Sequence, residues 1–146
     1  MPSDRMLKTM NAAHRVLLKL TGNRVGASFG GMPSLELTTI GRRSGTPRSV
    51  MLTSPLRQGA AYVVVASRGG DDIHPAWFLN LRDNPAVRVR VVGEPERPMR
   101  ARIASTDERA VLWPLITAKY RNYAGYQKRT TREIPLVLLE PPTVGE

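Results

Sequence analysis

Apolar and polar residues alternate along several short segments of the chain. Ser34–Ile40 sets leucines against polar residues, and Ala86–Val92 sets valines against arginines. This period-two pattern is typical of strands with one face on a core. Ser49–Leu56 is a further strand candidate that should end near Pro55, and Pro98–Ala104 follows a turn as the hairpin partner of Ala86–Val92. Ala60–Ser67 is apolar and rich in β-branched residues, which predicts a strand buried on both faces.

Three other segments have helical character. Residues 4–20 place apolar side chains on one side of a helical wheel and basic side chains on the other. Pro75–Arg82 predicts a short helix, because proline is favoured in a first turn. Thr106–Lys119 predicts a longer helix, since Ser105 or the next residue can cap it and acidic residues fill its first turn. Pro114 should kink or divide this helix.

A last strand, Ile134–Leu139, completes a set of about six strands and three helices. The strands form hairpins without regular βαβ alternation, which predicts an α+β domain built on a mostly antiparallel sheet or barrel. A doubly wound dinucleotide-binding fold is therefore disfavoured. The 146 residues suit one core. We expect residues 1–30 to form an amphipathic helix with a glycine-rich connector, and residues 31–146 to form the folded domain.

Charge narrows the choice of partner. With 22 Lys and Arg against 12 Asp and Glu, the net charge is +10. This excess indicates an anionic partner: a nucleic acid, a membrane surface, or a phosphorylated or carboxylated small molecule. Cysteine is absent, which excludes disulfides and cysteine chemistry and suits a reducing cytoplasm. We expect a cytoplasmic protein, since no signal peptide is visible and the longest apolar run, Ala60–Ala66, is too short to span a bilayer.

The basic face of the helix expected at residues 4–20 has two interpretations. It is either the solvated side of a helix docked on the core, or a surface that contacts an anionic membrane face. The second interpretation would place the protein at the inner face of the cell membrane as a peripheral protein.

The loop between the first two strands, Gly41–Ser49, is rich in arginine. Arg42, Arg43 and Arg48 flank a glycine turn, and guanidinium groups with outward-facing amides form a cradle for phosphate or carboxylate oxygens. The loop lacks the Lys-Ser/Thr pair of a P-loop. A second glycine and arginine loop, Ser67–Gly70, follows the most apolar strand, so the two loops could converge on one anion. The alternative is two ordinary turns with solvated arginines.

Two further segments combine aromatic and polar residues. Asn80 lies within a short apolar helix, as either a satisfied buried amide or a ligand contact. Tyr120, Tyr123 and Tyr126 recur every three residues and would share one helix face. They form either a packing stripe or the wall of a wet pocket, where each phenol offers a ring and a hydrogen-bond donor. His74 has no histidine or cysteine at metal-ligand spacing, so no metal site is predicted.

Side chains for catalysis are scarce in this sequence. It has no carboxylate pair at obvious acid–base spacing, no G-x-S-x-G elbow and no H-E-x-x-H motif. If the protein is an enzyme, a bound cofactor should carry the reaction.

Three blocks in this order resemble the deazaflavin-dependent nitroreductase and quinone reductase family: LELTTIGRRSGTPRSV, VVVASRGGDDIHPAWFLNLRDNPAVRVRV and YRNYAGYQKRTTREIPLVLLEP. They span about residues 34–141. The resemblance implies a split β-barrel over residues 31–146, related to the FMN-binding oxidoreductases, with coenzyme F420, an 8-hydroxy-5-deazaflavin, as cofactor. It also implies hydride transfer from reduced F420 to an electron-poor small molecule (a quinone, nitroaromatic or enone) and an actinobacterial origin.

The resemblance further assigns roles to individual residues. Those expected to contact the phosphate and oligoglutamate tail of the coenzyme are Arg42, Arg43, Ser44 and Arg48. Those expected beside the tail or ring are Ser49, Val50, Met51 and Leu52. Those expected around the deazaflavin ring and ribityl chain are Val65, Ala66, Ser67, Arg68, Ala76, Trp77 and Asn80. Tyr123 would lie near the coenzyme and Tyr120 and Tyr126 on the substrate side, with Ser67 and the tyrosine hydroxyls as catalytic donors to the acceptor's oxygen.

Three alternatives stay open. The barrel could be a non-catalytic carrier of a flavin or an acyl ligand, an FMN-dependent sister enzyme, or a nucleic-acid-binding module. The last is least favoured, because aromatic residues are only 5% of the chain and the tyrosines cluster at one end. Both a monomer and a homodimer are compatible with the pattern.

Overall fold

The computed structural model describes residues 28–29 and 32–142. The strands are β1 (Ser28–Phe29), β2 (Met32–Ile40), β3 (Pro47–Thr53), β4 (Leu56–Gln58), β5 (Ala61–Val65), β6 (Ala86–Val91), β7 (Arg97–Ile103) and β8 (Leu136–Glu140). The helices are the 3-10 turn η1 (Arg68–Gly70), α2 (Ala76–Asp83), α3 (Thr106–Lys119) and α4 (Arg121–Lys128). The helix expected at residues 4–20 lies outside the described residues, as does most of the first expected unit, residues 1–30.

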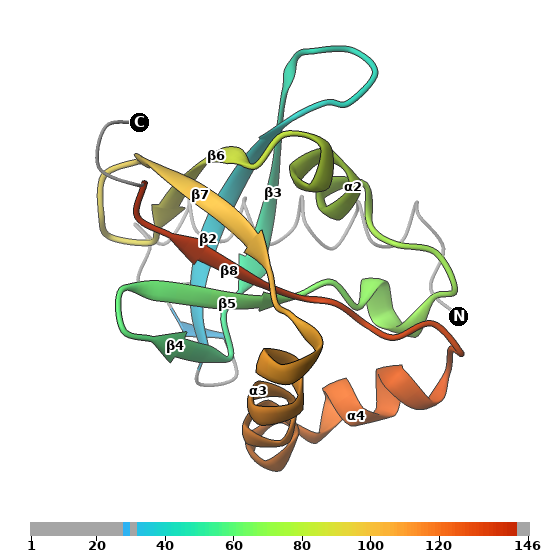
Figure 1. The fold of residues 1–146 in the computed structure, drawn as a ribbon. Coiled ribbons are helices and arrows are strands. Elements are labelled where there is room, and N and C mark those ends of the chain that lie inside the picture. Colours follow the sequence, from blue (N-terminus) through green and yellow to red (C-terminus); the bar gives the residue numbers. More distant parts are fainter. Residues whose placement is uncertain (1–27, 30–31, 143–146) are drawn as a thin grey trace.

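The described strands form one antiparallel sheet that curves into an open barrel. The order across the sheet is β1-β2-β6-β7-β8-β5-β4, and β3 pairs with β2. No ladder between the described strands joins β4 to β1 or β3, so the barrel is not closed. Figure 1 shows α2 near the β2–β3 hairpin, and α3 and α4 together at the opposite end. The predicted class, an α+β split β-barrel, is confirmed.

Two apolar cores lie on the two faces of the sheet, and β5 belongs to both. Tyr62 and Val64 pack into the core under α2, whereas Ala61, Val63 and Val65 pack into the core under α3 and α4. Successive side chains of a strand point to opposite faces, so every residue of β5 is buried. This confirms the predicted burial on both faces. β6 alternates buried valines with exposed residues, also as predicted.

The strand expected over Ser49–Leu56 is β3, which ends at Thr53, and Leu56 already begins the next strand, β4. The chain leaves β2 at the end of β3 and pairs with β5 through β4. Buried Ser54 lies at the switch: its amide donates to the carbonyl of Pro33 at 2.9 Å, and its hydroxyl donates to the carbonyl of Val63 at 2.8 Å. One serine thus joins both parts of the sheet, a long-range contact that local patterning does not reveal.

The helix α3 runs unbroken through Pro114, so the expected division does not occur. The proline lacks the N–H that would bond to the carbonyl of Ala110. Ala110 is exposed, so water can satisfy that carbonyl. The predicted cap at Ser105 is confirmed. Its hydroxyl accepts from the amide of Glu108 at 3.1 Å, and the Glu108 carboxylate accepts from the amide of Ser105 at 3.0 Å.

Candidate functional site

The turn between β2 and β3 is closed by its own hydrogen bonds. The amide of Gly41 donates to the carbonyl of Thr46, and the amide of Gly45 donates to the carbonyl of Gly41, both at 2.8 Å. Gly45 has a φ of +71°, which glycine adopts readily. The hydroxyl of Ser44 lies 2.8 Å from that of Thr46. The turn therefore has a defined shape before any ligand binds.

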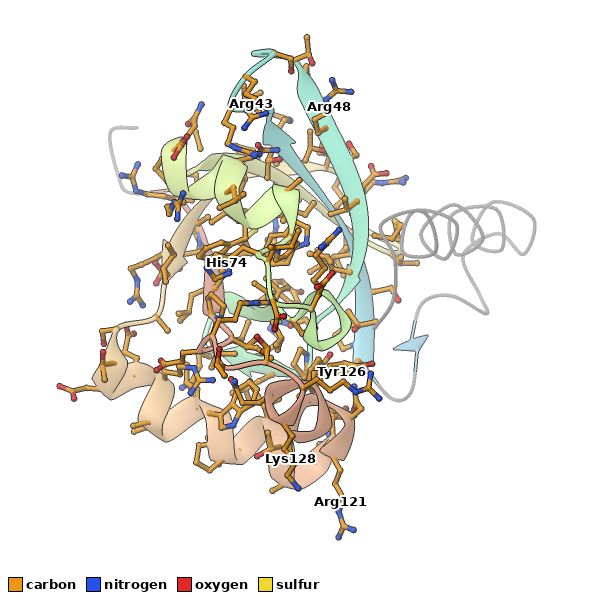
Figure 2. The ribbon with its side chains drawn as sticks, turned by 90° about the vertical axis from the view of Figure 1, so that its right-hand side faces the viewer. Arg43, Arg48, His74, Arg121, Tyr126 and Lys128 are labelled. Atoms are coloured by element: carbon orange, nitrogen blue, oxygen red, sulfur yellow. The ribbon has the colours of Figure 1, made fainter. Side chains whose placement is uncertain are left out.

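Two arginines on this turn have no partner in the described part of the chain. Arg43 and Arg48 are exposed, and neither makes a hydrogen bond, ion pair or ring contact with a described residue. Some other exposed arginines are paired with carboxylates, as Arg88 is with Glu96, whereas Arg97 and Arg121 also lack a partner among the described residues. Figure 2 shows Arg43 and Arg48 at the hairpin end of the molecule. Their ten N–H donors leave this end electropositive and open to an anion.

Arg42 is instead anchored through Asn80 of α2. The Asn80 Oδ1 accepts from the Arg42 amide at 3.1 Å and from its Nη1 at 3.4 Å. The Asn80 Nδ2 donates to the Thr39 hydroxyl at 3.1 Å. With 4% of its surface exposed, Asn80 is the satisfied buried amide of the two alternatives, and it fixes the base of the arginine hairpin to α2.

The loop after β5 has a constrained backbone. Arg68 has a φ of +47°, followed by +67° at Gly69 and +85° at Gly70. A Cβ on Gly70 would lie 2.7 Å from the carbonyl oxygen of Tyr126, so only glycine allows η1 to pack against α4. Ser67 is 9% exposed, and its hydroxyl has no hydrogen-bond partner among the described residues.

The two arginine loops differ in how far their charge is already paired within the chain. Arg68 forms a 2.6 Å ion pair with Asp71 in its own loop. The strand before it, β5, neighbours β4 and β8 in the sheet, not β2 or β3. Of these two loops, the β2–β3 hairpin therefore carries the arginines without a described partner, and the β5 loop offers mainly backbone groups and the Ser67 hydroxyl.

The three tyrosines divide between the two interpretations. Tyr123 is 6% exposed, and its hydroxyl donates to the sulfur of Met32 at 3.5 Å. Burial raises the pKa of the Tyr123 phenol. Tyr126 meets its ring edge-on at a centroid distance of 6.0 Å. Tyr120 and Tyr126 are half-buried at the edge of the second core, and neither hydroxyl has a hydrogen-bond partner among the described residues.

Most of the other residues expected beside the coenzyme are apolar and could contact it only through packing. Those that are buried are Met51, Val65, Ala66 and Trp77. Those that are half-buried against the first core are Val50 and Leu52. Ala76 and Ser49 are exposed, and the Ser49 hydroxyl lies 2.7 Å from that of Thr38. All lie on β3, the end of β5 or α2, between the hairpin and α4.

His74 and Arg132 form a contact that the sequence pattern did not reveal. The Arg132 Nη1 lies 3.1 Å from the His74 Nδ1, and the imidazole lies 4.7 Å from the ring of Phe78. Burial lowers the pKa of His74, and the charges of Arg132 and Arg82 lower it further. The ring is therefore neutral at pH 7, with Nδ1 as the acceptor. In the described chain it contacts Arg132 and Phe78.

Other parts of the described chain offer little for catalysis. No group of three potential metal-ligating side chains occurs among the described residues. In the same residues, no helix is long and apolar enough to cross a membrane. A groove of about 500 Å³ lies beside α3, and its lining residues include Arg102 and the two carboxylates that Arg102 already pairs with, Glu108 and Glu140. No predicted site residue lines it.

The open antiparallel barrel is that of the split β-barrel class, and its basic hairpin is open to an anionic ligand. The family model of the F420H(2)-dependent quinone reductases matches residues 9–141. The chain therefore belongs to this family, which confirms the predicted family, its oxidoreductase class and F420 as its coenzyme.

Known relatives agree with this assignment. An F420H(2)-dependent quinone reductase of Mycobacterium tuberculosis is 37% identical over 132 residues, 86% of each chain. The solved structure of an F420-H2 dependent reductase (FDR-A) is 38% identical, with a TM-score of 0.64 over 74% of this chain and 94% of that one. A structure described as a domain-swapped dimer is 32% identical, with a TM-score of 0.63 over 90% and 96% of the two chains.

Proposed function

We propose that this protein transfers a hydride from reduced coenzyme F420 to a quinone or a similar electron-poor acceptor. The observation that carries the proposal, beyond family membership, is the pair of unpartnered guanidinium groups on the β2–β3 hairpin, Arg43 and Arg48. A surface of this kind favours a ligand with several negative charges.

The hairpin fits the chemistry of the coenzyme. F420 carries a phosphate and an oligoglutamate tail, and a guanidinium fork matches the oxygens of both. Arg43 and Arg48 would hold this tail, with the remaining N–H groups of Arg42 and with Ser44 beside them. Val50, Met51 and Leu52 of β3 would lie beside the tail or the ring of the coenzyme. Around the ring we place Val65, Ala66, Ser67, Arg68, Ala76 and Trp77, while Asn80 would act indirectly by holding Arg42.

When bound, the reduced coenzyme supplies the hydride from its ring carbon, so no protein nucleophile is required. The chain's own part is to hold the acceptor and to stabilise the negative charge that develops on its oxygen. Three hydroxyls without partners in the described residues are suitable donors to that oxygen, and they belong to Ser67, Tyr120 and Tyr126. The Tyr123 hydroxyl is already engaged, so its ring would support Tyr126.

The experiment is a binding titration followed by a turnover assay. The protein is titrated with oxidised F420, FMN and haem, and then assayed for reduction of menadione by reduced F420. We expect binding of F420 in preference to FMN, and turnover. Binding of FMN without F420 would indicate an FMN-dependent sister enzyme. F420 binding without turnover of any quinone or nitroaromatic tested would indicate a carrier.

Two further parts of the proposal concern assembly and location. The related domain-swapped dimer supports a homodimer, which light scattering at several concentrations would distinguish from a monomer. The basic face expected for residues 4–20 supports peripheral contact with an anionic membrane. Sedimentation with vesicles of neutral and of anionic lipid tests that contact, and equal binding to both would contradict it.

A further inference from the structure

Arg132 lies between α4 and β8, and its guanidinium reaches back to the loop that follows β5. Its Nε donates to the carbonyl of Asp71 at 2.8 Å, its Nη2 to the carbonyl of Ser67 at 2.8 Å, and its Nη1 to the carbonyl of Ala66 at 3.2 Å. With the Nη1 contact to the His74 Nδ1 at 3.1 Å, all four acceptors belong to residues 66–74. One side chain thus holds the whole loop.

These hydrogen bonds hold the backbone of the loop and do not pair the guanidinium with a carboxylate. The carboxylate of Asp71 is paired with Arg68, and three of the four Arg132 acceptors are main-chain carbonyls. The acceptors lie on both sides of the left-handed run formed by Arg68, Gly69 and Gly70. A run of this kind persists only where its surroundings determine it. Arginine suits this position because its planar fork donates from three separate nitrogens to acceptors spread along the loop, whereas a lysine ammonium donates from a single nitrogen.

The loop held in this way contains the candidate donor Ser67 and packs through Gly70 on the carbonyl of Tyr126. We propose that Arg132 is a positioning residue: it holds residues 66–74 in the conformation that receives the deazaflavin ring and presents the Ser67 hydroxyl to the acceptor. This inference rests on the proposed function, since it assumes that the loop lines the coenzyme. The local sequence pattern does not single out Arg132.

The test compares Arg132→Gln and Arg132→Lys with Arg97→Gln. Arg97 is exposed at the start of β7, and its side chain has no partner among the described residues, so its replacement removes the same charge without disturbing the loop. Losing several hydrogen bonds from a charged donor should raise the Kd for oxidised F420 about tenfold in both Arg132 variants. The Arg97 variant should bind F420 like the wild type. In the Arg132 variants, the KM for menadione should change less than about twofold.

A second measurement tests, independently of the coenzyme, whether Arg132 holds residues 66–74; we call this set of contacts the clamp. The chain has two histidines. In a His14→Gln background, His74 is therefore the one histidine whose imidazole signals appear in the NMR spectrum. We expect its Nδ1 to be unprotonated in the wild type at pH 7. In the Arg132→Gln variant its pKa should rise toward the ordinary value, and both tautomers should be populated.

Each outcome decides the proposal. A folded Arg132→Gln variant with the F420 affinity of the Arg97 variant overturns it, whether or not the His74 signal moves. If the wild type neither binds nor oxidises the coenzyme, the proposed function fails, while the His74 signal still reports the clamp. If both Arg132 variants fail to fold, hydrogen exchange in the wild type decides. The amides of Gly70 and Asp71, which donate to Ser67 and Arg68, must then be protected like those of β5, and rapid exchange refutes the clamp.

Discussion

Replacing Arg43 and Arg48 by glutamine should weaken the binding of F420 and leave binding of its phosphate-free deazaflavin nucleoside unchanged. Neither side chain has a partner in the described residues, so the replacements remove nothing from the fold. The free energy of unfolding should stay within about 0.5 kcal/mol of the wild-type value. Arg42 is unsuitable for this test, because its Nη1 donates to Asn80 and its loss would disturb the base of the hairpin.

The size of the expected loss in F420 affinity follows from the exposure of the two arginine side chains. Exposed ion pairs contribute about 0.2–1 kcal/mol, and hydrogen bonds to charged groups about 1.5–3 kcal/mol. Arg43 and Arg48 are exposed, so we expect about 1 kcal/mol from each. That corresponds to about a fivefold rise in Kd for each single variant and about a thirtyfold rise for the double variant if the two effects add.

The assay is titration of both ligands at low and at moderate salt, with Arg97→Gln as the control for net charge. Salt should weaken F420 binding by the wild type more than by the double variant, because fewer screened contacts remain. An unchanged F420 affinity in the double variant would refute the assignment of the hairpin. An equal loss for the nucleoside would refute it as well, since the nucleoside has no phosphate or tail.

Three further predictions concern the scaffold. Gly70→Ala should lower the free energy of unfolding by about 1–3 kcal/mol in a urea titration, because the new Cβ meets backbone 2.7 Å away, while Gly93→Ala at a similar φ but in open space should cost less. Ser105→Ala removes one half of the capping box and should cost about 1 kcal/mol in the same assay. Because the pKa of His74 is lowered on folding, the unfolded chain binds more protons below its ordinary pKa of 6.5, so stability should fall as the pH drops from 7 toward the folded value. His74→Gln should reduce this slope, and an unchanged slope would contradict the reasoning.

The sequence by itself determined the elements whose environment follows from local patterning. The alternating valines of β6 and the continuous apolar run of β5 required one and two packed faces, and the structure provides them. The capping residues before α3 were readable in the same way. The order of the three sequence blocks between residues 34 and 141 was specific enough to indicate the family, and the family model and the relatives confirm it. These features depend on residues that lie close together in the chain.

The tertiary structure alone decided which polar groups are already satisfied. Arg42 and Arg43 are neighbours in sequence, yet Asn80 binds the first and the second has no partner among the described residues. Tyr123 is buried, whereas Tyr126 stays half-exposed. Arg132 meets its acceptors 58 to 66 residues away. Hydrogen-bond satisfaction and burial depend on groups brought together from distant parts of the chain, and no local pattern encodes that pairing.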